Sequence, residues 1–309
     1  MKIALVKMSS MGDIIHTLPA VTDFYKINPE VRFTWIVEEG FNEIPSWHPA
    51  VERVISINLR RLKKEWRTKE PWQDFYKHFH ELGEEPYDGV IDAQGLIKSA
   101  LVTKCLHGPR HGYDKTSARE RWASICYQHQ HVVSTEMHAI DRIRELFAKA
   151  FAYNLPSPTI DYGISREQFT NKTPSTSPVV FIHSSSRDEK CWPEQNWRKL
   201  AELCTKANIP VLLPWGSHHE HVRAERIAHE LENCTVLPKM SLTQLAELLA
   251  HAKQVIAVDT GLAHLTAALG TPCLTLYGPT DTSKIGTRGD YQEHGKLNDD
   301  PGEVFGVFG

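Results

Sequence analysis

The residues best suited to chemistry stand at the ends of short apolar segments. The clearest case is VIAV at 255–258, which leads into Asp259, Thr260 and Gly261. A carboxylate, a hydroxyl and a glycine at the start of a helix suit a diphosphate, because the first backbone N–H groups of a helix point toward bound anions. His264 follows Thr260 by one helical turn, so both side chains can face one ligand. A helix cap beside a buried histidine remains the alternative interpretation.

A second candidate site is the hydroxyl-rich loop that follows the apolar segment VVFI at 179–182. It contains Ser185, Ser186 and Lys190, and a helix that starts at Pro193 comes next. Serine hydroxyls and backbone N–H groups before a helix can cradle an anion, and a lysine adds a point charge suited to phosphate. A solvated loop of mixed charges explains the same residues without a ligand.

Asp13 ends the loop 8–13, which follows the apolar segment at the start of the sequence. The loop is not G-x-G-x-x-G, so the fingerprint of dinucleotide-binding dehydrogenases is missing. Asp13 lies near a predicted helix N-terminus, where a carboxylate either caps the helix or faces a reacting group. The residues alone favour neither role over the other.

Glu220 is spaced from Ser217 as in a capping box, so the residues alone favour a structural role over contact with a ribose. The neighbouring His218, His219 and His221 do not form the i, i+4 pair of the HExxH zinc motif. No acidic pair of the DxD kind stands in a loop after a predicted strand. The sequence therefore implies no essential metal and no cofactor.

The segment 60–69 has six basic residues in ten, among them Arg60, Lys63 and Lys64, and aromatic residues follow at helical spacing between 72 and 79. A solvated charged face above core aromatics is the ordinary explanation of such a pattern. Basic residues beside aromatic ones also suit a surface that meets anionic lipid headgroups. Both interpretations stay open.

The elements that must position these residues alternate between apolar strands and amphipathic helices. Nine strands are predicted, at 3–7, 33–38, 53–57, 89–92, 179–183, 210–214, 235–237, 255–259 and 273–277. Several are almost entirely apolar, as expected of parallel strands covered on both faces. The alternation predicts α/β layers with parallel sheets, in which ligands bind beyond the carboxyl ends of the strands.

Length and composition predict two such domains. The 309 residues exceed the size at which a single core usually stops growing. Proline, serine and threonine are concentrated between 154 and 178, as in a linker. We therefore expect an N-terminal domain at 1–155, a linker at 156–178 and a C-terminal domain at 179–309, both doubly wound and facing a cleft.

Charge and hydropathy limit the partners and the location. The net charge is −3, so no overall basic field points to nucleic acid. No apolar stretch approaches the ~20 residues that span a bilayer, and no signal-peptide core follows the N-terminus. The six cysteines form no CxxC pair and are expected to be reduced. These features favour a cytoplasmic protein that can still touch a membrane surface.

Together these segments resemble the lipopolysaccharide heptosyltransferases, inverting GT-B enzymes of glycosyltransferase family 9. The resemblance runs from Met1 to about Asp281 and rests on VKMSSMGDIIHTLPA, VEEGFNEIPSWHPAVERVI, DAQGLIKSA, LPWGS, LPKMSL and DTGLAHLTAALGTPCLTLYGPTD. The last of these segments is shared among heptosyltransferases. The first, VKMSSMGDIIHTLPA, is typical of the branch that adds the first heptose. The resemblance implies two Rossmann-like domains, the N-terminal one for the acceptor and the C-terminal one for the nucleotide sugar.

The resemblance also implies substrates and roles. The donor is expected to be ADP-L-glycero-D-manno-heptose and the acceptor a Kdo residue of Kdo-lipid A, at the cytoplasmic face of the inner membrane. Asp13 matches the family's proposed catalytic base, and Lys190 would also stabilise the departing diphosphate. The positions that match donor contacts are Ser185, Ser186 and Lys190 for the phosphates, Glu220 and Met240 for ribose and adenine, and Asp259, Thr260, Gly261 and His264 for the signature segment. The positions that match acceptor contacts are Arg60, Lys63, Lys64 and Arg119.

Two alternatives remain open: a GT-B transferase of other specificity, such as a second-heptose transferase, and a non-catalytic protein that binds nucleotide or a lipid surface. The tail also departs from the family pattern. Family members end in a helix that crosses back onto the first domain, whereas residues 283–309 show no apolar periodicity. No such crossover helix is predicted there.

Overall fold

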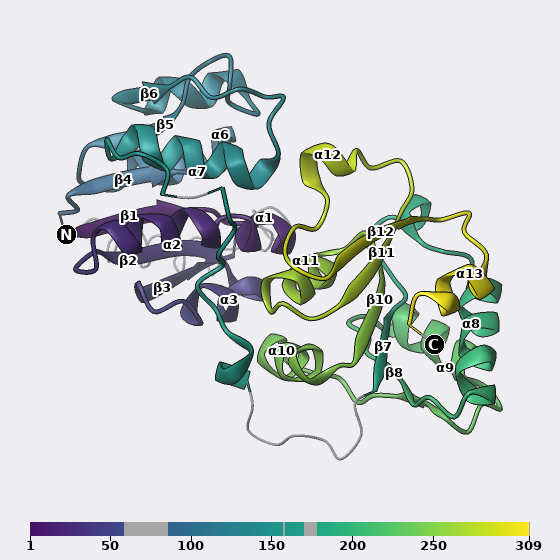
Figure 1. The fold of residues 1–309 in the computed structure, drawn as a ribbon. Coiled ribbons are helices and arrows are strands. Elements are labelled where there is room, and N and C mark those ends of the chain that lie inside the picture. The colour runs from purple at the N-terminus through teal and green to yellow at the C-terminus, as the bar shows by residue number, and fades with distance from the viewer. Residues whose placement is uncertain (59–85, 157, 170–177, 309) are drawn as a thin grey trace, which may run out of the picture. The chain divides into compact units, whose positions relative to one another are not determined.

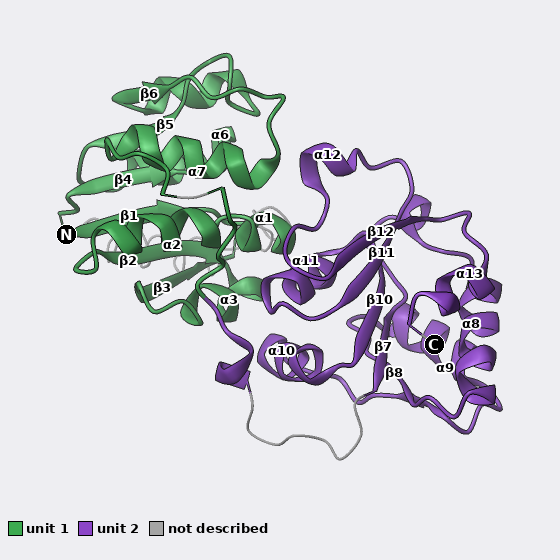
Figure 2. Cartoon of the chain, viewed as in Figure 1, with its two compact units in different colours: residues 1–163 green, residues 164–309 purple. Residues whose placement is uncertain are grey.

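The computed structural model describes residues 1–58, 86–156, 158–169 and 178–308. The chain forms two compact units, 1–163 and 164–309 (Figures 1 and 2). The division between the units falls inside the segment 156–178, where the composition predicts a linker. Each unit contains one six-stranded sheet in which every neighbouring pair of strands is parallel.

Unit 1 is built on strands in the order β3-β2-β1-β4-β5-β6. They are β1 (Lys2–Val6), β2 (Arg32–Glu38), β3 (Val51–Ile57), β4 (Gly89–Asp92), β5 (Arg110–Tyr113) and β6 (His129–His131). The described helices are α1 (Met11–Ile15), α2 (Leu18–Ile27), η1 (Glu39–Phe41), α3 (Glu43–Ser46), α6 (Ile97–Lys104), η2 (Arg121–Cys126) and α7 (Ala139–Ala150).

Unit 2 has the order β12-β11-β10-β7-β8-β9. Its strands are β7 (Val179–Ile182), β8 (Val211–Leu213), β9 (Cys234–Val236), β10 (Gln254–Val258), β11 (Cys273–Tyr277) and β12 (Gln292–Lys296). The described helices are η3 (Arg166–Phe169), η4 (Asp188–Lys190), α8 (Glu194–Lys206), α9 (His218–Ala228), α10 (Leu242–His251), α11 (Gly261–Ala268), α12 (Thr282–Ile285) and α13 (Pro301–Gly306).

Counted within its own unit, each sheet has the strand order 3-2-1-4-5-6, which is that of the doubly wound Rossmann fold. The order reverses between β1 and β4 in unit 1 and between β7 and β10 in unit 2. Ligands of open α/β sheets bind where the strand order reverses, at the carboxyl ends of the strands. The fold therefore places the candidate loops of each unit at the expected point.

Apolar side chains on both faces of the sheet explain why the strands of unit 1 are so hydrophobic. Ala4 and Val6 of β1 share one cluster with Val102 of α6. On β2, Phe33 has ring contacts with Phe24 of α2 and Phe147 of α7. A parallel strand covered on both faces buries every side chain, so it reads as a continuous apolar run.

The main core of unit 2 lies between its sheet and α8. Val179 and Phe181 of β7 cluster there with Trp197 and Leu200 of α8, all fully buried. Helix α11 contacts β10 and β11. The helices thus cover a sheet whose central strands, β7 and β10, have no exposed residue.

All nine predicted strands are present, with ends that differ by at most two residues. Three strands were not predicted: β5, β6 and β12. Their sequences are RHGY, HQH and QEHGK, which lack the apolar run or the alternation that marks a strand. They lie toward one end of each sheet, where a strand can be polar because backbone pairing with its neighbour suffices.

The tail contains a short helix that its sequence does not reveal, and this helix packs within unit 2. Residues 292–308 contain β12, which pairs with β11, and α13, which packs against α8. Val304 is buried, and Phe305 and Phe308 pack against the same core cluster. These residues anchor a helix of six residues, which is too short to produce a readable period.

Acid should lower the folding stability of both units, because each contains a buried histidine that stays neutral. His48 accepts a hydrogen bond at Nδ1 from the Ala50 N–H (3.1 Å), and its Nε2 is 2.9 Å from Thr22 Oγ1. Burial lowers the pKa of His48 in unit 1 and of His183 in unit 2 from 6.5 to about 4. The unfolded chain takes up these protons near pH 6.5, so stability is complete above that pH and falls as the pH drops toward 4.

We expect each histidine to remove about 2 kcal/mol of unfolding free energy between pH 8 and pH 5. Denaturant unfolding at both pH values measures this loss. His48→Gln should be less stable at pH 8 but lose less on acidification than the unsubstituted chain. An equal loss in both would show that His48 is not the titrating group.

Candidate active site

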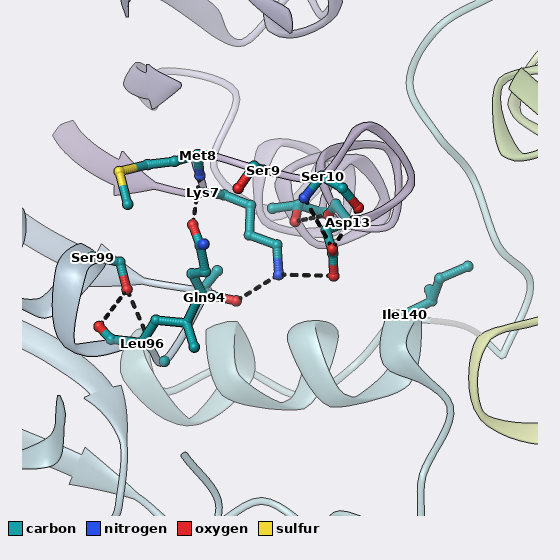
Figure 3. A network of polar contacts seen from close by, with 12 residues as sticks. Lys7, Met8, Ser9, Ser10, Asp13, Gln94, Leu96, Ser99 and Ile140 are labelled. Atoms are coloured by element: carbon teal, nitrogen blue, oxygen red, sulfur yellow. Dashed lines mark hydrogen bonds and ion pairs between the residues drawn. The ribbon is translucent and has the colours of Figure 1, made fainter. Parts of the chain in front are cut away.

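In unit 1, Lys7 follows β1 at the point where the strand order reverses. Its ammonium group is buried and donates to the Ala93 carbonyl after β4 (2.9 Å). The same Nζ lies 3.8 Å from Asp13 Oδ1, as Figure 3 shows. Burial lowers the pKa of Lys7, against the opposing effect of the Asp13 and Asp92 carboxylates. A cation and a carboxylate therefore meet directly at the carboxyl edge of this sheet.

The geometry of Asp13 is compatible with both roles that the sequence left open. Its Oδ2 accepts hydrogen bonds from the Ser10 backbone N–H (3.0 Å) and hydroxyl (2.9 Å), which is a capping arrangement at the start of α1. A third of the Asp13 side chain (33%) is still exposed. Burial raises its pKa, but Lys7 and the Ser10 hydrogen bonds together outweigh burial and hold the pKa below its usual value. Asp13 is thus an ionised, accessible carboxylate that also caps a helix.

The loop after β4 is fixed by Asp92, which is fully buried. Its carboxylate accepts from the Gln94 N–H (2.8 Å), the Gly95 N–H (3.1 Å) and the Tyr127 hydroxyl (2.7 Å). Gly95 adopts a φ of +69°, a conformation that favours glycine. Gln94 in turn accepts from the Met8 N–H (2.8 Å), so the loops after β1 and β4 are tied together (Figure 3).

Arg119 is the one predicted acceptor contact within the described residues, and it is exposed. Its backbone lies against Gly95, and the neighbouring Glu120 N–H donates to the Gly95 carbonyl (3.0 Å). The Arg119 charge also contributes to the low pKa of Asp13, after the larger effects of Lys7 and Ser10. Arg119 therefore stands at the same edge as Asp13. The other predicted acceptor contacts, Arg60, Lys63 and Lys64, lie outside the described residues.

In unit 2, the loops after β7 and β10 meet through Asp259. Its carboxylate forms an ion pair with Lys190 (Nζ to Oδ2, 2.6 Å) and accepts from the Thr280 hydroxyl. Ser185 donates to the Asp259 carbonyl (2.8 Å). Asp259 is 6% exposed and Lys190 19%. Three loops that are far apart in sequence therefore converge on one carboxylate.

The start of α11 completes this cluster. Thr260 is its N-cap residue, and no side chain caps the helix there. Gly261 is the first helical residue, and His264 is buried in the first turn. Backbone N–H groups at a helix start favour an anion, and Lys190 adds a positive charge beside them. Ser186 is exposed one residue beyond Ser185.

Glu220 stands in the first turn of α9, which follows β8, and Met240 stands in the loop after β9. Both follow strands whose carboxyl ends share one edge of the sheet, because all strands are parallel. The capping box expected for Glu220 is present: its Oε2 accepts from the backbone of Gly216 (2.6 Å) and Ser217 (3.2 Å), and the Ser217 hydroxyl accepts from the Glu220 N–H (3.3 Å). Met240 is half-buried, immediately before α10. Among the described residues, neither side chain forms a hydrogen bond or an ion pair with the Asp259 cluster.

A pocket of about 590 Å³ lies beside this cluster, lined by residues of the β11 and β12 ends. Thr280 lines it and also bonds to Asp259, and Lys296 adds a second cation. No group of three or more His, Cys, Asp or Glu side chains that could hold a metal occurs in the parts of the chain that the structure describes. No helix among those same residues is long and apolar enough to cross a membrane.

The sequence prediction missed Lys7, Asp92 and Gln94. A usable signal was present, because Lys7 and Asp92 are charges at the ends of apolar strands, as Asp259 is. Gln94 carries no such signal. Its role depends on a hydrogen bond to Met8, 86 residues away in sequence.

Two Rossmann-type units with charged loops at their strand-order reversals are the architecture of GT-B glycosyltransferases. The chain belongs to glycosyltransferase family 9 (heptosyltransferase), whose model matches residues 75–301. It is therefore an enzyme that transfers heptose. Lipopolysaccharide heptosyltransferase 1 of Escherichia coli strain K12 is 50% identical over 295 residues, which cover 94% of this chain and 92% of that protein. The protein of the same name from Salmonella typhimurium strain LT2 is 46% identical over 314 residues, covering 99% of both.

Two solved structures have the same fold and match nearly the whole chain. The Escherichia coli heptosyltransferase WaaC with ADP has a TM-score of 0.95 and 45% identity, covering 99% of this chain and 98% of that one. The same enzyme with ADP-2-deoxy-2-fluoro heptose has a TM-score of 0.92 and 44% identity, with the same coverage. The expected GT-B fold and heptosyltransferase family are confirmed.

Proposed function

We propose that this chain moves L-glycero-D-manno-heptose from ADP-heptose to a Kdo residue of Kdo-lipid A, with inversion at the anomeric carbon. The relatives named lipopolysaccharide heptosyltransferase 1 and the WaaC complexes with ADP and an ADP-heptose analogue support this specificity. The observation that carries it is the Lys190–Asp259 cluster at the start of α11, which has the charge and the helix terminus that a sugar diphosphate needs.

Donor binding is assigned to unit 2. Lys190, Ser185 and Ser186 contact the diphosphate together with the N–H groups of Thr260 and Gly261. Glu220 holds the ribose through Oε1, since both of its capping bonds use Oε2. Met240 covers the adenine, and Asp259 and His264 face the heptose. As ADP departs, Lys190 and the helix start stabilise the negative charge that develops on the β-phosphate.

The acceptor and the catalytic base are assigned to unit 1. The attacking Kdo hydroxyl bonds to the anomeric carbon as the bond to the ADP oxygen breaks, and Asp13 takes the hydroxyl proton. A carboxylate held below its usual pKa is a weak base, so it receives the proton late, when the attacking oxygen is already acidic. Arg119 at the same edge, with Arg60, Lys63 and Lys64, holds the acceptor's phosphates and carboxylates.

The reaction is proposed to need no metal, because cationic side chains and a helix N-terminus neutralise the leaving diphosphate. The acceptor is lipid-linked, so the chain is proposed to work at the cytoplasmic face of the inner membrane.

Mass spectrometry of the product tests the specificity. ADP-heptose and Kdo-lipid A should give one added heptose, and Kdo-lipid A that already bears one heptose should give none. A product formed only with the heptose-bearing acceptor would identify a second-heptose transferase. ADP binding without any product would contradict the proposal outright.

Lys7 should set the pH dependence of the reaction, because it is the largest influence that holds Asp13 ionised. Lys7→Met leaves Asp13 partly buried without that cation, so its pKa rises. The acid limb of the profile of kcat/KM against pH should move to higher pH, and the loss of activity should be greater at pH 5 than at pH 8.

Lys7→Arg is the matched control, since it keeps the positive charge and should leave the acid limb in place. Melting temperatures of both variants separate this effect from simple loss of the bond to the Ala93 carbonyl. An unchanged acid limb in Lys7→Met would mean that Lys7 only supports the fold.

A further inference from the structure

Four large apolar side chains lie exposed on unit 1 beside the site. Ile97 and Leu101 are on the outer face of α6 and are 43% and 54% exposed. Trp122 and Ile125 are on η2 and are 58% and 70% exposed. Single exposed apolar residues are common on proteins, but several on one surface mark a site of contact with another body.

These residues form one surface because α6 and η2 lie side by side. Ala100 of α6 packs in a buried cluster with Ala123 of η2 and Tyr127. At the start of α6, the Ile97 N–H donates to the Glu120 carboxylate (2.6 Å), which directly precedes η2. We call the exposed residues Ile97, Leu101, Trp122 and Ile125 the α6–η2 surface.

The charges on the same two elements are all positive. Lys98 and Lys104 belong to α6 and Arg121 belongs to η2, while neither element contains an aspartate or a glutamate. The Arg121 guanidinium lies 4.7 Å from the centre of the Trp122 ring. These three cations contrast with the net charge of −3 of the whole chain, although the Glu120 carboxylate lies next to them. Apolar side chains with surrounding cations suit the boundary between lipid tails and anionic headgroups.

The α6–η2 surface also adjoins the base. Lys98 Nζ lies 3.5 Å from Ser9 Oγ in the loop that leads to Asp13. Helix α6 begins two residues after Gly95, which is part of the loop fixed by Asp92. A bilayer lying against this surface would therefore have its headgroup layer next to Asp13.

We propose that the α6–η2 surface docks on an anionic lipid bilayer, with Trp122, Ile125 and Leu101 inserted at the headgroup boundary. Lys104 and Arg121 bind the lipid phosphates. Docking presents Asp13 to an acceptor whose lipid tails stay in the bilayer. The placement of the acceptor rests on the proposed function, whereas the binding to lipid does not.

Cosedimentation of the full chain with vesicles tests this. Vesicles of equal parts phosphatidylglycerol and phosphatidylcholine should bind the chain, and vesicles of phosphatidylcholine alone should bind it much more weakly. Trp122→Ser with Ile125→Ser should weaken binding at least tenfold, because two large side chains no longer leave water. Lys104→Gln with Arg121→Gln should weaken binding and reduce its dependence on salt.

The matched control is Ile27→Ser with Leu155→Ser, two residues of unit 1 that are 48% and 42% exposed outside α6 and η2. It should bind vesicles like the unsubstituted chain. Equal vesicle binding by Trp122→Ser/Ile125→Ser, or an equal loss in the control, would overturn the proposal. A change from dimer to monomer in the double variant would instead identify the surface as an interface between copies, and would also overturn it.

Activity measurements with two acceptors distinguish a failure of the docking proposal from a failure of the proposed function. With an acceptor stripped of its acyl chains, Trp122→Ser/Ile125→Ser should transfer heptose within twofold of the unsubstituted rate. With Kdo-lipid A in anionic vesicles, the same variant should be at least tenfold slower. If the unsubstituted chain transfers to neither acceptor, the proposed function fails, while vesicle binding still tests the docking surface. Equal losses with both acceptors would place the effect in the active site and contradict docking.

Discussion

Asp13→Asn should lower kcat by ~10²-fold or more while leaving the fold and ADP binding intact. The amide cannot accept the proton of the attacking hydroxyl. Asp13 is the N3 residue of the capping box whose N-cap is Ser10, and the bonds from Ser10 need only an acceptor oxygen, which the amide keeps. Lys7 keeps its bond to the Ala93 carbonyl, so we expect a melting temperature lower by about 5 °C or less.

Turnover, ADP affinity and melting temperature measured on one preparation separate catalysis from capping. Asp300→Asn is a matched control, because Asp300 also takes part in a capping box, at the start of α13 in unit 2. Its substitution should leave kcat unchanged. If Asp13→Asn turned over at nearly the unsubstituted rate, Asp13 would be only a cap and the reaction would lack a base among the residues assigned here.

Lys190→Ala should lower kcat/KM by ~10²-fold or more, since it removes a preorganised charge at the departing diphosphate. It also leaves the Asp259 carboxylate, which is 6% exposed, without its cation. The melting temperature should therefore fall as well, because a buried charge without a partner is costly. Calorimetric titration with ADP decides between the roles, since only loss of a phosphate contact weakens ADP binding.

Lys190→Arg should retain part of the activity because it keeps the charge. Lys149→Ala is the control for the loss of a lysine–carboxylate pair, since Lys149 pairs with Glu145 on α7, and it should leave kcat/KM unchanged. If the Lys190→Ala variant melted at a lower temperature but bound ADP with unaltered affinity, the role of Lys190 would be limited to neutralising Asp259. The diphosphate assignment would then have to rest on the helix start alone.

The two units share one way of building a polar site. Each places a lysine next to a carboxylate where its strand order reverses: Lys7 with Asp13 in unit 1, and Lys190 with Asp259 in unit 2. The surroundings decide how the two pairs differ. Asp13 is a third exposed, as its proposed role as the base requires, whereas Asp259 is nearly buried and accepts a further hydrogen bond from Thr280. Removing either lysine should therefore affect a different step, proton transfer in one unit and departure of the diphosphate in the other.

Much of the fold could be predicted from the sequence because its local patterns are strong. Strands β4, β7, β10 and β11 are visible because they are buried along their whole length and therefore apolar. The signature segments identify the family through the residue types that a helix start and a tight turn require. The polar strands β5, β6 and β12 escaped prediction because partner strands, not their own side chains, hold them. Helix α13 escaped because Val304 and Phe305 need the α8 face to bury them.

The sequence by itself determined the residue types of the site and the ends of strands at which they stand: Asp13, Lys190 and Asp259 follow apolar segments, and Gly261 starts a helix. Only the tertiary structure decided which of them meet. Lys190 is 69 residues from Asp259, and Met8 is 86 residues from Gln94, yet each pair is joined by a hydrogen bond. Parallel strands bring their carboxyl ends to one edge whatever their separation in sequence, and no local pattern records which strands become neighbours. The exposure of Trp122 and Ile125 has the same origin, since apolar residues remain at a surface only when the packing of α6 against η2 leaves them there.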